Sequence, residues 1–563
     1  MTIYKFKYPI ILSVIISLIV LAIFSGVLTA DFIMWDDDIN MIINTKSGGL
    51  SFKNIYLAFA DFDSMSRYNP LNSLSQSAIY HFFHLNPFGY HLVSWLFHGL
   101  SSGLLFLIIR KIMLLSLTIQ SDNKKVHRHI NIVASLATLF WALHPLRVEA
   151  VAWAAAAGHN QALFFLLLST LCYIEAIDSE SDKNRYIYLI ISAFIFYTVS
   201  LFSQGIGMTY FAVFFILDVF LFKRIGGTIG WWKSRTAKRV LFEKLIFAIP
   251  AIFVIVMSIV VRIKAAGISQ PSISLSEFGI LERLMQAMYI LSYYIWRPFY
   301  PVDLAPVYST LVSFDPLSIP FISSAFSVIA VSIVLFIFRK RCPIIVALFL
   351  AYIILLIPFM GFFEHPHYHC DRYSIFPSIC FSIIIAFGLI NLMKNKYFSV
   401  ISISILAVII SVLGWLSFNQ VKIWNNSESL FTHVIRTLGN DPYKQDIYWR
   451  LGEYLYNNGR EEEAIINFEK TLAIIPNHPR ANSHLAEIEY KNGNLIKSIY
   501  HFQKLLNFDP NNFRAHYNLS ILFNKLNKKK EAAYHFKRAV DLQRSNNSAM
   551  LNAKTAQPGT QTD

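Results

Sequence analysis

Long apolar runs separated by short polar segments fill the first 420 residues of the chain. Eleven of these runs approach the length that a helix needs to cross a bilayer, about 20 apolar residues. They lie at about residues 9–29, 90–114, 130–145, 160–177, 186–203, 205–222, 243–263, 318–338, 343–359, 373–393 and 397–417. The pattern predicts an all-α, polytopic membrane domain over residues 1–420 with a first outer loop at 30–90.

One further apolar segment, residues 284–299, decides the predicted topology because it is short and contains Arg297 and Pro298. If this segment spans the membrane, the basic residues 339–341 face outward, against the tendency of positive loops to stay inside. We therefore interpret it as re-entrant or interfacial. The N-terminus is then cytoplasmic, the C-terminus lies outside, and the first outer loop and the loop at 364–372 share the outer face.

After residue 420 the composition becomes that of a soluble domain, and the sequence repeats every 34 residues. The repeated positions are Pro442, Pro476 and Pro510; Leu451, Leu485 and Leu519; and Phe468, Phe502 and Phe536. A helix–turn–helix unit of this length is the tetratricopeptide repeat, which buries its apolar face by stacking on its neighbours. We predict a repeat domain at 421–546, with repeats at 445–478, 479–512 and 513–546, and a disordered tail at 547–563.

Composition agrees with a membrane protein, since 55% of residues are hydrophobic and only 15% are charged. The net charge of +15 arises mostly in short loops between apolar runs, which argues against a nucleic-acid partner. The four cysteines have no CxxC spacing, so they indicate neither a zinc site nor a disulfide framework. Phosphate-loop and dinucleotide-binding fingerprints are absent from the sequence, which disfavours an ATP-driven transporter.

Three consecutive acids, Asp36, Asp37 and Asp38, directly follow the first apolar run. Acids at a membrane surface are costly to desolvate and are candidates for function. A carboxylate here could serve as a general base or stabilise positive charge that develops on a sugar. A solvated helix flank explains the same three residues equally well, and the spacing alone leaves both interpretations open.

Two charged pairs, Arg147 with Glu149 and Asp371 with Arg372, also lie close to apolar runs. An arginine there could grip a lipid phosphate through forked hydrogen bonds, but an outer-face salt bridge is the simpler explanation. The run His365-x-His-x-His369, with Glu364 and Asp371 nearby, makes a divalent metal possible. A histidine-rich interfacial loop is favoured over a metal site.

Several motifs occur in the order found in one family. They are Trp35-Asp-Asp-Asp-Ile-Asn40, Arg67-Tyr-Asn-Pro-Leu71, Asn86-Pro-Phe-Gly-Tyr-His-Leu92, His144-Pro-Leu-Arg-Val-Glu-Ala150, Trp296-Arg-Pro298 with Pro301-Val-Asp-Leu304, and Asp371-Arg-Tyr373 with Pro377-Ser378. With them the chain resembles the integral-membrane C-type glycosyltransferases. It resembles more closely the transmembrane and tetratricopeptide-repeat-containing O-mannosyltransferases and their bacterial relatives.

The resemblance implies transfer of a mannose-like sugar from a polyprenyl-phosphate donor to an acceptor hydroxyl, often a protein Ser or Thr, outside the cytoplasm. It implies a bacterial inner-membrane protein with periplasmic repeats that bind an acceptor or partner protein, without a resident metal or cofactor. It makes Asp36 and Asp37 the candidate catalytic acids. The candidate substrate-binding residues are Asp38, Arg67, Arg147, Glu149, Arg297, Asp371 and Arg372.

The chain departs from the family at two cations, since His159 follows Gly158 and Gln204 follows Ser203 where relatives carry Arg and Lys. These changes remove positive charge that would balance a leaving phosphate. Two alternatives therefore stay open. One is a non-catalytic membrane scaffold that presents its repeats, and the other is a ligase that transfers a lipid-linked oligosaccharide.

Overall fold

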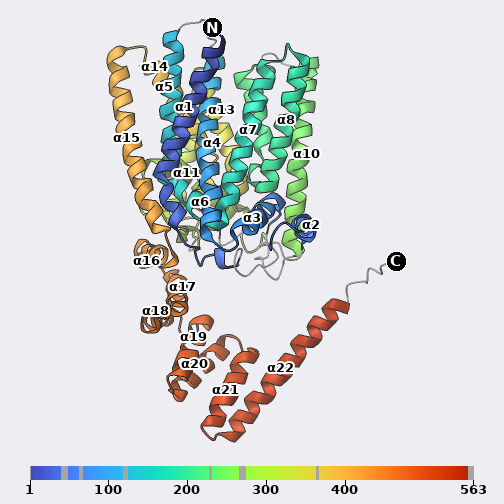
Figure 1. Cartoon of the computed structure of the whole chain (residues 1–563), viewed down its shortest axis with the longest axis vertical. Helices are drawn as coiled ribbons and strands as arrows, with labels where there is room; N and C mark the ends of the chain where they lie inside the picture. Colours follow the sequence, from blue (N-terminus) through green and yellow to red (C-terminus); the bar gives the residue numbers. More distant parts are fainter. Residues whose placement is uncertain are drawn as a thin grey trace. The chain divides into compact units, whose positions relative to one another are not determined.

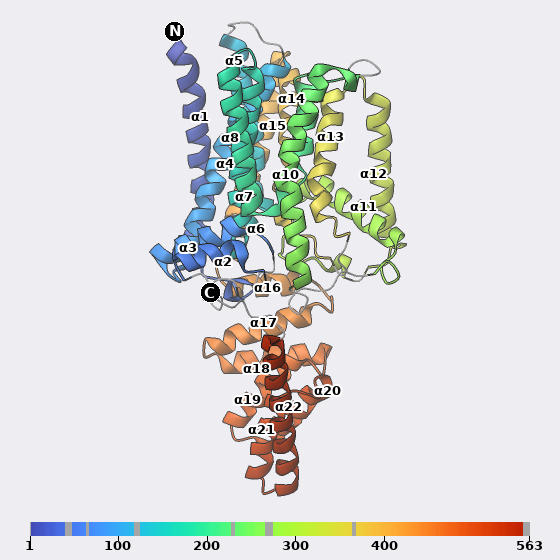
Figure 2. The ribbon, with the colours of Figure 1, turned by 90° about the vertical axis from the view of Figure 1, so that its right-hand side faces the viewer.

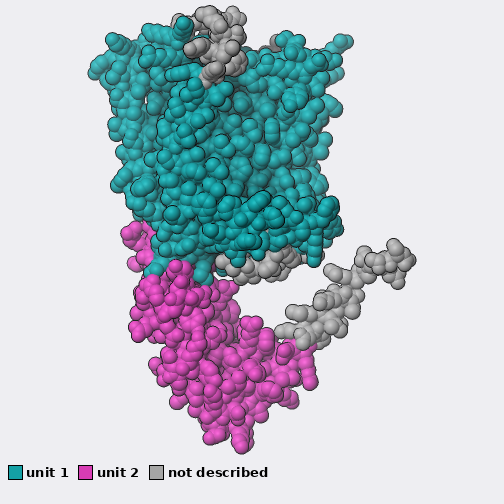
Figure 3. All heavy atoms as spheres, in the orientation of Figure 1, with its two compact units in different colours: residues 1–429 teal, residues 430–563 magenta. Residues whose placement is uncertain are grey.

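The structure is a computed structural model that describes residues 2–39, 48–62, 67–117, 124–226, 231–264, 274–312, 314–362 and 367–555. Over these residues the regular elements are helices, which confirms the predicted all-α fold. The chain divides into two compact units, residues 1–429 and residues 430–563 (Figure 3). Each unit is described by itself.

The first unit is built from long apolar helices. Six pass a test of length and composition for crossing a membrane, or seven if a helix pair bent by 57° counts as one span. The six are α4 (Pro87–Ser116), the segment Ala154–Asp178 that contains α7 (Ala157–Asp178), α8 (Lys183–Ser203), α10 (Arg235–Lys264), α12 (Ile319–Phe338) and α15 (Lys396–Ile423). The bent pair joins α5 (Lys124–Ala142) to the segment Pro145–Ala152, which contains α6 (Val148–Ala152).

Four shorter apolar segments accompany these helices, and all eleven predicted spans fall on a long helix, the bent pair or a short segment. The four are Tyr8–Ile23 in α1 (Thr2–Ile23), Gly205–Leu221 with α9 (Tyr210–Ile216), Pro343–Phe359 with α13 (Pro343–Leu356), and α14 (Ile379–Leu392). The number of helices that cross the membrane stays a prediction. The segment at 284–299 corresponds to α11 (Ile280–Trp296), which runs obliquely to its long neighbours (Figure 2).

Large apolar side chains are exposed along the outer helices, among them Ile249 of α10, Phe326 of α12 and Trp415 of α15. Such a surface is stable when lipid covers it, because hydrocarbon solvates apolar side chains without a penalty. The first unit is therefore a multi-pass membrane domain.

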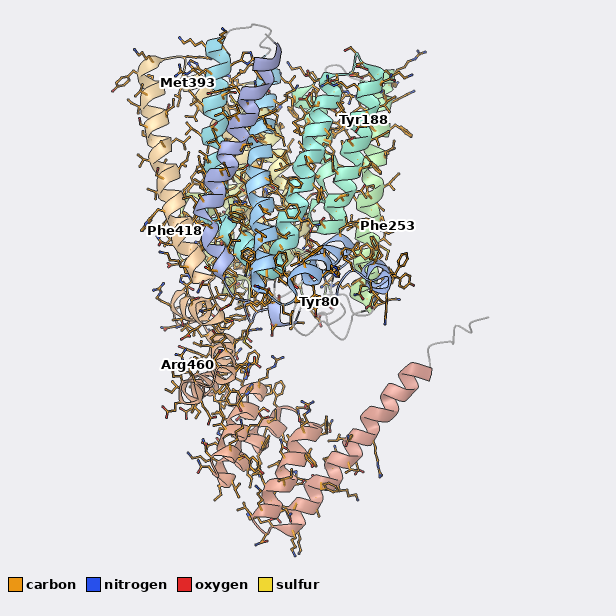
Figure 4. All side chains as sticks on the ribbon, viewed as in Figure 1. Tyr80, Tyr188, Phe253, Met393, Phe418 and Arg460 are labelled. Carbon is orange, nitrogen blue, oxygen red and sulfur yellow. The ribbon has the colours of Figure 1, made fainter. Side chains whose placement is uncertain are left out.

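The two ends of the first unit differ in architecture. Figures 1 and 2 both show α2 (Phe52–Ala60), α3 (Pro70–Phe83) and α6 gathered toward one end. Tyr80 lies at that end, whereas Tyr188 and Met393 lie at the other (Figure 4). The segments that carry most candidate residues belong to the end with α2 and α3, as the contacts below establish.

Two basic residues that follow the sixth predicted span have acidic partners inside the unit. Arg224 forms ion pairs with Asp218 at 3.1 Å and with Glu243 at 2.9 Å, and Lys244 pairs with Asp218 at 2.7 Å. Asp218 is completely buried. Arg224 and Lys244 therefore have buried acidic partners, which neutralise part of the positive charge of the chain.

The second unit consists of helix pairs that match the predicted repeats. They are α17 (Lys444–Asn457) with α18 (Glu461–Ile474), α19 (Pro479–Lys491) with α20 (Leu495–Phe508), and α21 (Phe513–Lys525) with α22 (Lys529–Thr555). α16 (Ser427–Thr437) precedes them and begins in the first unit. Phe468 and Phe502 are buried between successive helices, whereas Phe536 of the last pair is 53% exposed.

The turns inside the helix pairs carry a further set of positions at the same spacing of 34 residues. Gly459, Gly493 and Asn527 have φ values of 76°, 80° and 58°. Glycine reaches this left-handed region without strain, and asparagine tolerates it better than most residues do. α22 continues to Thr555, so residues 547–555 are helical where a disordered tail was expected, and residues 556–563 lie outside the described part.

Candidate functional site

The three acids lie in a segment after α1 that we call the acid loop, residues 30–39. Asp37 is completely buried in it. One carboxylate oxygen accepts the Ile33 N–H at 2.9 Å, and the other accepts the Ala155 N–H at 2.8 Å. Burial raises the pKa of Asp37 to about 7, although these two amides act to lower it. Asp37 thus fixes the acid loop to the chain between α6 and α7.

Asp36 differs from its neighbour in both exposure and backbone conformation. Its side chain is exposed, and its φ is 127°. A positive φ at a non-glycine residue is strained and persists only where the surroundings impose it, commonly at functional sites. The Asp36 N–H donates to Asp38 Oδ1 at 3.1 Å. Of the two candidate catalytic acids, Asp36 is the one whose carboxylate is exposed.

A second group forms around Glu149 of α6 and Arg372 of the short helix η12 (Asp371–Ser374). Glu149 accepts the Arg372 backbone N–H at 3.0 Å and also a hydrogen bond from the Arg372 guanidinium. The guanidinium lies 4.9 Å from the Trp153 ring and 5.0 Å from the Tyr373 ring. Both charged side chains are buried. A buried ion pair is stable only when hydrogen bonds accompany it, and the bonds between Arg372 and Glu149 meet this requirement.

Asp371 belongs to a separate network through Tyr308. The Tyr308 hydroxyl donates to the Asp371 carboxylate at 2.9 Å and accepts from Arg297 Nη2 at 3.0 Å. Burial, together with the charge of the nearby Glu149, raises the pKa of Asp371 to about 7. The Tyr308 hydroxyl therefore lies between Arg297 and Asp371 and links them through its two hydrogen bonds. Sequence reasoning found Arg297 and Asp371 but missed Tyr308, which lies in an irregular segment without a recognisable motif.

Arg147 is 1% exposed, and one of its nitrogens donates to Ser374 Oγ at 2.7 Å. Its Nε and Nη1 have no hydrogen-bond partner among the described residues, and neither has Nε of Arg297. Buried N–H groups of a guanidinium need acceptors, and an anion would supply them. Arg147, Arg297 and Arg372, here called the arginine cluster, are linked through Ser374, Tyr308 and Asp371.

The acid loop and the arginine cluster meet at residues 153–155. Ala155 donates to Asp37, and the Trp153 ring packs against the Arg372 guanidinium. Asp36, Asp37, Arg147, Glu149, Arg297, Asp371 and Arg372 therefore belong to one connected region. Arg67 is exposed, and its charge acts on Cys370, next to Asp371. Asp38 is half-buried and contacts the Asp36 backbone.

Both positions that depart from the family lie beside this region. His159 stacks on Tyr373 with ring centres 6.5 Å apart, and its Nδ1 contacts the Ala156 carbonyl at 3.1 Å. Gln204 accepts a hydrogen bond from Asn69 at 3.1 Å. His159 and Gln204 thus each contact an uncharged group, and the arginine cluster supplies positive charge to the region.

The two described histidines of the run, His367 and His369, have different neighbours. His367 contacts the Phe359 carbonyl at 2.9 Å, whereas His369 lies among the rings of Tyr289, Tyr293 and Tyr308. Neither ring nitrogen of His369 has a hydrogen-bond partner in the part of the chain that is described. Among described residues no group of three His, Cys, Asp or Glu could hold a metal ion; His365 and Glu364 lie outside them.

An apolar cavity of about 110 Å³ lies inside the first unit. Its walls come from α4, α7, α9, α13 and α14, and Phe376, two residues after Ser374, is one of them. The remaining lining includes Leu105, Leu166, Tyr210, Ala347 and Cys380. A cavity with apolar walls suits a hydrocarbon chain, and Phe376 connects its lining to η12 through two residues of the chain.

Comparison with known proteins identifies a tetratricopeptide repeat and relatives that are named protein O-mannosyl-transferases. Residues 445–478 match the tetratricopeptide repeat family. The chain is 32% identical to human protein O-mannosyl-transferase TMTC2 over 162 residues, 29% of this chain and 18% of that protein. It is 22% identical to human protein O-mannosyl-transferase TMTC1 over 463 residues, 76% of this chain and 50% of that protein.

Mouse protein O-mannosyl-transferase TMTC4 is 32% identical over 124 residues, 22% of this chain and 16% of that protein. The matched segments span half or less of the length of these relatives. The chain is therefore similar to the protein O-mannosyl-transferases of the transmembrane and tetratricopeptide-repeat-containing type, as the ordered motifs predicted.

Proposed function

We propose that this chain is a membrane glycosyltransferase that moves a mannose-like sugar from a polyprenyl-phosphate donor to a hydroxyl of a protein acceptor. The observation that carries the proposal is the connection of an exposed carboxylate, Asp36, to buried guanidinium groups with unused N–H donors. The names of the relatives, protein O-mannosyl-transferases, support a sugar transfer of this kind.

In the proposed reaction, Asp36 accepts the proton of the acceptor hydroxyl as its oxygen bonds to the anomeric carbon of the sugar. The bond from that carbon to the phosphate oxygen breaks, and polyprenyl phosphate leaves with the negative charge. Arg147 and Arg297 supply N–H donors to this phosphate, because part of their donor capacity is unused. Donors that are already in place stabilise the leaving group without reorganisation.

Asp37 and Glu149 have positioning roles in this scheme. Asp37 holds the backbone from which Asp36 projects, since both of its oxygens accept main-chain N–H groups. Glu149 holds Arg372 and the start of η12. The apolar cavity beside Phe376 accommodates part of the polyprenyl chain. The reaction as written needs no resident metal or cofactor.

The predicted topology places this region on the non-cytoplasmic face, in a bacterial inner membrane with periplasmic repeats. The repeats would then gather the acceptor or a partner protein, because stacked repeats form extended binding surfaces. A reporter fused after Ser417 tests the orientation: it should report the outside, and a cytoplasmic signal would reverse the assignment.

The experiment for the activity uses the full chain in lipid nanodiscs with polyprenyl-phosphate [³H]mannose and Ser/Thr-containing peptides. Label should move to peptide with the wild-type chain, and Asp36→Asn should lower transfer at least about a hundredfold, as expected for loss of a general base. Asp315→Asn, at an exposed acid that accepts the Leu317 N–H, is the matched control. No transfer with any polyprenyl-phosphate hexose would favour the scaffold alternative, which the neutral contacts of His159 and Gln204 also support.

A further inference from the structure

The segment that leads from the last membrane helix toward the repeats is bonded to the acid loop. Residues 424–427 follow α15 and enter α16, on which the second unit begins at Leu430. The Asn425 carbonyl accepts the Asp31 N–H at 2.8 Å, and Ser427 Oγ accepts the Met34 N–H at 2.9 Å. Ser427, the first residue of α16, is completely buried.

The same segment also touches the arginine cluster. Trp424, which is 2% exposed, packs on Trp153 with ring centres 6.1 Å apart and planes inclined by 32°. The Trp153 ring packs against the Arg372 guanidinium. Trp153 also lies two residues before Ala155, whose N–H donates to Asp37. Residues 424–427 therefore contact both halves of the candidate site.

We propose that Ser427 and Trp424 are positioning residues of the candidate site, and that the segment carrying them couples α16 to the acid loop. The proposal rests on the proposed function for its catalytic meaning, but the coupling itself is a property of the fold. Changes at the start of the repeat-bearing part of the chain alter the acid loop, and changes in the acid loop alter α16, because coupling between two sites is reciprocal.

The strained backbone of Asp36 explains why the acid loop depends on its anchors. A φ of 127° at this residue persists only while the neighbouring chain is held. The acid loop is held from two directions, by Asp37 on the α6–α7 side and by Asn425 and Ser427 on the α15–α16 side. Asn425 acts through its main chain, so Ser427 is the anchor on this side that a substitution can remove.

Hydrogen–deuterium exchange of the full chain in nanodiscs tests the proposal without any assay of activity. Ser427→Ala should speed exchange of amides in residues 31–39 about fivefold to tenfold, the effect of removing one net hydrogen bond. Ser427→Thr keeps the hydroxyl and should resemble the wild type.

Ser429→Ala is the matched control, because the Ser429 hydroxyl bonds Asn426 and Ile423 of the same turn. Unchanged exchange in Ser427→Ala, or an equal increase in Ser429→Ala, would overturn the positioning role.

The reciprocal arm uses Asp37→Asn, which weakens the anchor on the α6–α7 side. Amides of residues 428–437 in α16 should then exchange severalfold faster, while those of α20, which is remote in sequence, should keep the wild-type rate. Unaltered exchange in α16 would overturn the coupling.

In the transfer assay, Ser427→Ala should lower kcat about tenfold and leave the donor KM unchanged, since the acid and not the phosphate site is disturbed. If no variant transfers sugar yet exchange changes as expected, the proposed function fails and the coupling stands. If the wild-type chain transfers sugar and Ser427→Ala keeps its kcat, the positioning role fails and the function stands.

Discussion

The Asp37 carboxylate accepts the Ala155 backbone N–H at 2.8 Å, and this contact bonds the acid loop after α1 to the segment between α6 and α7. The adjacent Asp36 is exposed at a strained φ. Two neighbouring acids of the same type thus have different tasks: one is buried and fixes the loop, and the other presents its carboxylate. The predictions below separate such roles by pairing a measurement of stability with one of activity.

Stability should depend on pH through Asp37. Burial raises its pKa from an ordinary 3.8 to about 7. The folded chain therefore keeps the proton between these values while the unfolded chain has lost it, so stability falls as pH rises from about 4 to about 7. Asp37→Asn cannot ionise and should show a shallower fall, with Asp371 still contributing its own share because burial also raises its pKa to about 7. Thermal unfolding in detergent between pH 4 and 8 measures this, and parallel curves for the two proteins would contradict it.

Arg147 should be more important for donor binding than for stability. It is buried with two unpartnered nitrogens among the described residues, and an incompletely paired buried charge is destabilising. Arg147→Met should therefore leave the thermal unfolding midpoint unchanged or raise it, while donor binding measured by titration with the polyprenyl-phosphate sugar becomes undetectable. Arg110→Met is the control, since its guanidinium bonds Asn131 outside the candidate site. Retained donor affinity in Arg147→Met would remove this residue from the phosphate site.

The buried pair of Glu149 and Arg372 should show the asymmetry typical of buried ion pairs. Glu149→Ala leaves the Arg372 charge buried without its partner, which costs about 3–5 kcal/mol in the free energy of unfolding. The double variant Glu149→Met with Arg372→Met removes both charges and should recover most of that stability without recovering sugar transfer. Equal destabilisation in the single and double variants would show that the pair contributes through packing alone.

The repeats offer a comparison of equivalent positions 68 residues apart. Phe468 is completely buried, whereas Phe536 is 53% exposed at the end of the stack. Phe468→Ala should lower the free energy of unfolding of the repeats by about 3–5 kcal/mol, the usual loss for a buried phenylalanine. Phe536→Ala should lower it by less than about 1 kcal/mol. Urea unfolding followed by circular dichroism distinguishes the two, and similar losses would mean that the last helix pair is covered in solution.

The fold could be predicted from sequence because its signals are periodic and local. Apolar runs locate the membrane helices, and a spacing of 34 residues locates the repeats. The left-handed turns at Gly459, Gly493 and Asn527 share that spacing. The extension of α22 over residues 547–555 was not foreseen, since a polar composition without apolar periodicity gives no helix signal.

The candidate site could be predicted only in part. The acids and arginines stood out as charges beside apolar runs, but adjacency gave no means of telling Asp36 from Asp37. That distinction depends on the Ala155 amide, which lies 118 residues away in the chain. Tyr308, Ser374 and Ser427 were missed for the same reason: a single hydroxyl carries no signal in the sequence until the fold brings its partner to it.

Mass spectrometry of envelope proteins from cells that lack this chain, complemented with wild type or with Asp36→Asn, tests most directly whether Asp36 acts in sugar transfer. Wild type should restore hexose on Ser or Thr of acceptor proteins, and Asp36→Asn should not, although it is made in equal amount and unfolds at the same temperature. Restoration of the same modification by Asp36→Asn would contradict the assignment of Asp36 as the catalytic carboxylate.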